Sequence, residues 1–137
     1  MKRNDPGFKS FLPGIAWFFM VGVLVFMPGN DLPEPGWLDF PYLDKIVHAG
    51  MFGGLTFLFC LPICKSQYPV KQKYSTCMRI VLAAIAWGLA VEFIQKFFVP
   101  GRSFEIADWA ADTAGVLAGW WLSRILIRTT RSIRQQQ

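Results

Sequence analysis

Residues 43–64, LDKIVHAGMFGGLTFLFCLPIC, decide the fold class of this 137-residue chain. From residue 46 to residue 64 the only titratable groups are His48 and two thiols. A bilayer core of about 30 Å needs roughly 20 apolar helical residues at ~1.5 Å each, and this segment is long enough. We therefore interpret it as a membrane-spanning helix.

Three further segments have the same apolar character, and they are residues 11–27, 80–99 and 106–127. Hydrophobic residues make up 53% of the chain and charged residues 17%, against roughly 25% charged in an average soluble domain. This composition excludes a disordered chain, and three clustered cysteines are too few for a disulfide framework. We predict one all-α domain over residues 1–137, a four-helix transmembrane bundle with a basic tail at 128–137.

Basic residues gather on one side of the predicted spans. Eleven of the 14 lie there, namely Lys2, Arg3, Lys9, Lys65, Lys71, Lys73, Arg79, Arg124, Arg128, Arg131 and Arg134. Since cytoplasmic segments carry an excess of Lys and Arg, we predict that both termini are cytoplasmic. The net charge of +5 does not indicate nucleic acid, because the basic residues follow a membrane boundary.

Polar residues gather at the opposite, outer ends of the last three spans. An Asp, Lys or Arg at mid-span costs about 2.5 to 3.5 kcal/mol on insertion scales, so such residues indicate a function. We predict that they line an outward-facing ligand pocket, and they are Asp44, Lys45, His48, Glu92, Gln95, Arg102, Asp108 and Asp112. A spacing of four places Asp44 with His48, and Asp108 with Asp112, on single helix faces that we expect to meet inside the bundle.

The order of these residues carries a resemblance to a known family. The pattern is Asp44-Lys45-x-x-His48, Glu92-x-x-Gln95, Pro100-Gly101-Arg102-Ser103-x-Glu105-x-x-Asp108 and Gly115-x-x-x-Gly119. From Asp44 to Gly119 the chain resembles the VanZ-like family, named after a protein associated with resistance to the glycopeptide antibiotic teicoplanin. The resemblance implies a multi-pass protein of the bacterial cytoplasmic membrane with a role in the cell envelope. Asp112 stands where many relatives have an asparagine, which adds an acid to the site.

Two of these residues have a functional and a structural interpretation. His48 is a general base, a proton relay or a ligand, or else a residue of the helix start that Asp44 orients. Glu92 is a functional intramembrane carboxylate, or it forms an internal ion pair with Lys45 or Arg102. Neither choice follows from spacing alone.

Arg102 also has two interpretations. Its planar donor fork suits a phosphate or carboxylate of a ligand, or it bridges to Asp108 and holds the loop. Lys45 either joins Arg102 in holding an anion or extends to the lipid headgroups. Small residues on the inner face of the last span, Gly115 and Gly119, let a neighbouring helix approach closely.

Metal and hydrolase chemistry receive little support from the sequence. His48 and the nearby carboxylates resemble a His-plus-carboxylate ligand set, but only one histidine and no cysteine reach that side. We therefore predict no metal and no other cofactor. Ser103 lacks the context of a nucleophile elbow, which argues against a serine hydrolase.

The leading hypothesis is recognition of an anionic amphiphile, either a lipid-linked cell-wall intermediate or a lipoglycopeptide-type antibiotic. The first alternative is a membrane enzyme acting on a lipid-linked phosphate, with His48, Glu92 and Asp108 as candidate catalytic residues. The second is a structural accessory subunit with an internally satisfied polar network. We expect a membrane lipid or lipid-linked envelope intermediate as partner and no nucleic acid, and we leave an oligomer open.

Overall fold

The structure is a computed structural model that describes residues 5–28 and 43–135, with only the helical backbone for 131–135. Its elements are the 3-10 helix η1 (Phe8–Phe11) and the α-helices α1 (Leu12–Val25), α2 (Leu43–Lys65), α3 (Val70–Phe98) and α4 (Ile106–Gln135). These described segments contain no strand. The predicted all-α fold with four long helices is confirmed.

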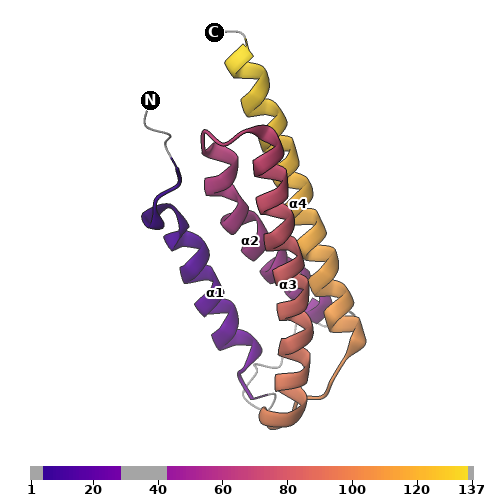
Figure 1. The fold of residues 1–137 in the computed structure, drawn as a ribbon. Helices are drawn as coiled ribbons and strands as arrows, with labels where there is room; N and C mark the ends of the chain where they lie inside the picture. Colours follow the sequence, from indigo (N-terminus) through magenta and orange to yellow (C-terminus); the bar gives the residue numbers. More distant parts are fainter. Residues whose placement is uncertain (1–4, 29–42, 136–137) are drawn as a thin grey trace.

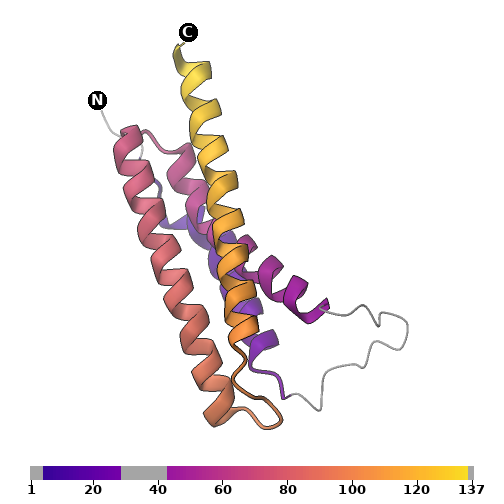
Figure 2. The same ribbon diagram turned by 90° about the vertical axis from the view of Figure 1, so that its right-hand side faces the viewer.

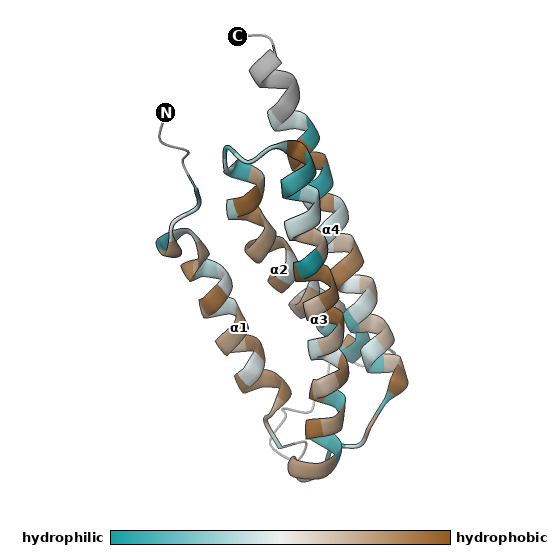
Figure 3. Cartoon of the chain, in the orientation of Figure 1, coloured by the Kyte–Doolittle hydropathy of each residue, from teal (hydrophilic) through white to brown (hydrophobic). Residues whose placement is uncertain are grey.

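The four helices run alternately in opposite directions (Figure 1). One end of the bundle, which we call the polar end, holds the last residues of α1 and α3 and the first residues of α2 and α4. The other end, the basic end, holds the starts of α1 and α3 and the end of α4, so both described chain ends lie there (Figures 1 and 2). In Figure 3 the ribbon of α1 is mostly brown (hydrophobic) or pale, whereas α3 and α4 also carry teal (hydrophilic) segments.

Two helices are longer than the apolar segments that predict them. α3 begins at Val70, ten residues before the expected span at 80–99, and α4 continues to Gln135 instead of 127. Residues 70–79 contain no Gly or Pro, so nothing interrupts the helical hydrogen bonds when the sequence becomes polar. The length of an apolar segment predicts which part of a helix crosses the membrane, whereas helix-breaking residues such as Gly and Pro determine where the helix itself ends.

Three helical segments are long and apolar enough to cross a membrane, and they are Phe8–Val25, Leu43–Lys65 and Val70–Phe98. α4 does not reach this level of hydropathy over its described length, because its first turns carry Asp108 and Asp112. Both acids are buried against the other helices. The crossing of the membrane by α4 therefore stays a prediction, and it depends on this inward orientation.

Close backbone contact joins α2 to α4, which pack against each other along much of their length. A methyl group added to Gly115 would collide with the Ala49 carbonyl, and one added to Gly119 would collide with the Gly53 carbonyl. Only glycine permits this approach, as the spacing on α4 predicts. The contact fixes the start of α2 against the start of α4, which sets the geometry of the polar end.

Two hydrogen bonds attach α1 to the other helices. Trp17 Nε1 donates to the Met51 carbonyl at 2.9 Å, and Gln95 Nε2 donates to the Val25 carbonyl at 2.7 Å. The second bond satisfies a carbonyl at the last turn of α1, where no helical N–H follows. Buried Val21 and Phe52 add apolar packing between these helices. α1 is therefore held at its middle and at its polar end.

Candidate functional site

Charged side chains from three helices meet at the polar end. We call this group the polar cluster, and it consists of Asp44, Lys45, His48, Glu92, Glu105, Asp108 and Asp112. The close packing of α2 on α4 brings their first turns together, and α3 adds Glu92 from its last turns. Six of these residues belong to the predicted ligand pocket. Asp44 is exposed, and the other five are buried or half-buried: Lys45, His48, Glu92, Asp108 and Asp112.

Lys45 neutralises the outer part of the cluster. Its Nζ donates to Asp44 Oδ2 at 2.8 Å, to Glu105 Oε2 at 2.9 Å and to Asp108 Oδ1. An ammonium group has three N–H donors, so all three are in use. Lys45 thus binds acids of its own chain, and no donor remains for an anionic ligand in this arrangement.

His48 forms a buried pair with Asp112 rather than with Asp44. The distance from His48 Nδ1 to Asp112 Oδ1 is 2.9 Å, and His48 Nε2 lies 3.9 Å from Asp108 Oδ2. The interpretation in which Asp44 orients His48 is therefore not supported, because the exposed Asp44 side chain turns towards Lys45. The carboxylate that pairs with His48 of α2 comes from the neighbouring helix α4.

Glu92 is the most deeply buried acid of the cluster, with none of its surface exposed. Its Oε2 accepts the backbone N–H of Glu105 at 2.9 Å, while Oε1 is buried and has no hydrogen-bond partner in the described part of the chain. Among the described residues neither Lys45 nor Arg102 forms an ion pair with Glu92, so that structural interpretation is not supported. An unpaired carboxylate oxygen in a membrane interior is costly, which favours a partner that comes from outside the chain.

Arg102 lies in the loop between α3 and α4, next to Gly101 in the left-handed region at φ 74°. Its Nε is buried and has no partner within the described part of the chain. The alternative pairing with Asp108 is not supported, because the described charged partners of Asp108 are Lys45 and His48. Arg102 is thus a half-buried cation that forms no ion pair with an acid of the residues that the structure describes.

Comparison with known families identifies one match. The VanZ/LLP1 family model matches residues 7–127, which includes all the residues of the polar cluster. The chain belongs to the VanZ/LLP1 family. The predicted resemblance is therefore confirmed, over a longer stretch than the motifs alone. No curated protein and no solved structure matches the chain.

Two residues of this VanZ/LLP1 protein revise the predicted pocket. Gln95 is buried, but its amide bonds to Val25 of α1 and so links helices. Glu105 was missed as a site residue although it gives its side chain to Lys45 and its backbone N–H to Glu92. The sequence feature that could have identified Glu105 as a site residue is its position three residues before Asp108 and immediately before α4.

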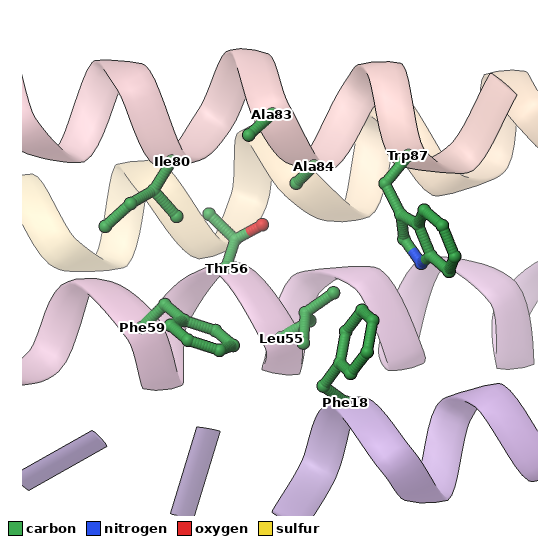
Figure 4. A pocket seen from close by; sticks show the side chains of 8 residues that line it. All are labelled: Phe18, Leu55, Thr56, Phe59, Ile80, Ala83, Ala84 and Trp87. Carbon is green, nitrogen blue, oxygen red and sulfur yellow. The ribbon is translucent and has the colours of Figure 1, made fainter. Parts of the chain in front are cut away.

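A cavity of about 310 Å³ opens among α1, α2 and α3 of the VanZ/LLP1 bundle (Figure 4). It is lined by Phe18, Leu55, Thr56, Phe59, Ile80, Ala83, Ala84 and Trp87. Trp87 precedes Glu92 by five residues on α3, so the cavity starts roughly 7 Å deeper in the bundle than the cluster. Its walls are almost entirely apolar, which suits a hydrocarbon chain.

The polar cluster has two chemical capabilities. A histidine held by a carboxylate is the usual arrangement of a general base. One ligand atom from each of His48, Glu92 and Asp108 lies within 4.8 Å of the others, and so does one from each of Asp44, Glu105 and Asp108. The same side chains can therefore move a proton or hold a cation.

Proposed function

We propose that this VanZ/LLP1 protein binds an anionic amphiphile, with its headgroup at the polar end and its hydrocarbon chain among the helices. The observation that carries the proposal is the half-buried Arg102, whose Nε has no partner within the described residues. A guanidinium group presents a planar fork that matches phosphate or carboxylate. Charge-assisted hydrogen bonds of this kind are about twice as strong as neutral ones.

The acids of the cluster narrow the class of headgroup. A simple anion near five carboxylates and one lysine would meet repulsion. Asp44 and Glu105 are more than half exposed in their side chains and can accept hydrogen bonds from hydroxyl or ammonium groups. The headgroup we propose therefore combines a phosphate or carboxylate with sugar or amine donors, as a lipid-linked cell-wall intermediate or a lipoglycopeptide-type antibiotic does.

The apolar cavity supports the placement of the lipid chain. Phe18 of α1, Leu55 of α2 and Trp87 of α3 line it, so it lies on the side of the bundle where α1 is attached (Figure 4). Each buried CH₂ contributes about 0.8 kcal/mol. A chain in this cavity would add affinity that is independent of the headgroup.

Untargeted lipid mass spectrometry of the protein purified in native lipid tests the proposal. We expect an anionic amphiphile to be enriched with the wild type and depleted with Arg102→Lys. Arg124→Lys is the matched control, because Arg124 lies on α4 away from the cluster, stacked on Trp120. Equal lipid content in the wild type and both variants would refute the proposal.

A second function is favoured by the buried His48–Asp112 pair at 2.9 Å. In this alternative the protein is an enzyme that cleaves or transfers a lipid-linked phosphate, with His48 as general base. Turnover of a long-chain lipid monophosphate that is lost in His48→Gln would support it. Saturable binding without any product would instead support the binding protein.

A further inference from the structure

Three buried side chains from three different helices converge at the polar end. They are His48 of α2, Glu92 of α3 and Asp108 of α4, and one nitrogen or oxygen atom of each lies within 4.8 Å of the other two. All three residues are at least nine-tenths buried. Such a convergence of acceptor atoms needs a cation or a proton at its centre.

Asp112 determines which nitrogen of His48 faces this centre. An ionised carboxylate only accepts hydrogen bonds, so with Asp112 ionised the 2.9 Å contact places the proton on His48 Nδ1. In a neutral imidazole, Nε2 then has a free lone pair, and it faces Asp108 Oδ2 at 3.9 Å. Carboxylate–histidine pairs of this kind orient the ligands of metal ions in proteins.

Glu92 supplies an independent observation. Within residues 5–28 and 43–135, its Oε1 has no partner although the residue is fully buried, and Oε2 accepts only the Glu105 N–H. The ammonium group of Lys45 is directed to Asp44, Glu105 and Asp108 instead of Glu92. The inner part of the cluster therefore holds three buried carboxylates, those of Glu92, Asp108 and Asp112, and Lys45 reaches only one of them.

We infer that His48, Glu92 and Asp108 bind a divalent transition-metal ion, with Asp112 as the positioning residue of His48. A dication compensates the buried negative charge and satisfies Glu92 and the Nε2 lone pair together. One imidazole and two carboxylates suit Zn²⁺ or Mn²⁺, and Zn²⁺ is the first probe. The sequence predicted no metal because only one histidine and no cysteine reach that side, whereas the structure brings ligand atoms of His48 and two of the carboxylates within 4.8 Å of one another.

Three protein ligands leave a coordination position for water or for a ligand oxygen. In the proposed function, a phosphate or carboxylate of the headgroup occupies this open coordination position of the metal. This one statement rests on the proposed function. The metal site itself stands on the three side chains alone.

The neighbouring set of Asp44, Glu105 and Asp108 provides an internal control. Its ligand atoms are also within 4.8 Å of one another, but Lys45 Nζ already lies among them. A metal ion there would have to displace an ammonium group. Glu105→Gln therefore changes an acid of the cluster without removing a ligand of the inferred site.

Equilibrium dialysis with elemental analysis tests the inference on chelator-stripped protein in detergent micelles. We expect one Zn²⁺ per chain for the wild type and for Glu105→Gln. His48→Gln and Glu92→Gln should each weaken binding at least about tenfold, and Asp112→Asn about tenfold as an outer-shell change. Co²⁺ in place of Zn²⁺ should give visible absorption bands that are lost in His48→Gln.

Size-exclusion profiles and unfolding temperatures of the stripped variants separate lost ligands from lost fold. Asp108→Asn replaces Glu92→Gln if the latter does not fold. Failure of the stripped wild type to bind Zn²⁺ or Mn²⁺ stoichiometrically would overturn the inference and leave His48 as an imidazolium between two aspartates. Unchanged binding in the His48 and Glu92 variants would also overturn it. No amphiphile is added, so either result is independent of the proposed function.

Discussion

At the scale of single residues, Lys45 holds the outer acids of the cluster together. It bonds to three carboxylates, of which Asp108 is buried and Asp44 is mostly exposed. Removing one partner of a buried ion pair leaves the other charge uncompensated, whereas an exposed pair contributes little. Most of the effect of Lys45 on stability should therefore come through Asp108.

Lys45→Gln should lower the free energy of unfolding by about 1–3 kcal/mol, the range for a buried polar group that loses its partner. Denaturant unfolding in detergent micelles measures it. Lys96→Gln is the matched control at the same end, because Lys96 is exposed and lies 5.3 Å from the centre of the Phe97 ring. Equal stability of the two variants would show that Lys45 does not organise the cluster.

The residues of the cluster could be predicted from sequence, but their partners could not. Polar residues at the ends of apolar segments identify Lys45, His48 and Glu92 without a structure, because polar groups are costly in a membrane. Which carboxylate orients His48 depends on the axial register of α2 against α4. Spacing within one helix carries no information on that register, so Asp112 was placed in the pocket but not as the partner of His48.

At the scale of helices, glycine determines how α2 and α4 pack. The spacing of Gly115 and Gly119 predicted a close approach, and the two glycines lie against the backbone of Ala49 and Gly53. The start of α3 at Val70 could not be predicted from the apolar pattern, because the ten residues before the predicted span are largely polar. Its first turns are continuous with the span and place Lys73 against the Cys64 carbonyl at 2.5 Å.

Gly115→Ala should destabilise the bundle by about 1–3 kcal/mol, the usual cost of overpacking, because the added methyl group meets the Ala49 carbonyl. Gly50→Ala on α2 is the control, since nothing lies within 4 Å of its position. It should be neutral or stabilise by up to about 1 kcal/mol through helix propensity. Thermal unfolding compares them, and the packing model fails if Gly115→Ala is as stable as Gly50→Ala.

At the scale of the whole molecule, the two ends of the bundle carry different charged residues. The polar end holds buried acids and Arg102, and the basic end holds Lys71, Arg79 and Arg124. This asymmetry is the basis for the predicted orientation with cytoplasmic termini. A site that receives a ligand from the outer leaflet requires the polar end to face outward.

Single cysteines in a variant without Cys60, Cys64 and Cys77 test this orientation. Ser103→Cys lies on the exposed loop of the polar end, and Lys71→Cys lies on the exposed start of α3. In intact cells an impermeant thiol reagent should label only the cysteine at 103. After permeabilisation it should label both, and labelling of position 71 in intact cells would reverse the orientation.

The central claim is that Arg102 binds the anionic headgroup of an amphiphile, and its direct test is the affinity of purified protein for a long-chain lipid whose headgroup phosphate carries an amino sugar. Lysine keeps the positive charge but lacks the bidentate fork, so Arg102→Lys should bind about tenfold to a hundredfold more weakly. Its unfolding temperature should stay close to that of the wild type, because Arg102 forms no ion pair with the described residues. Unchanged affinity in Arg102→Lys, alone or together with a loss of stability, would contradict the account.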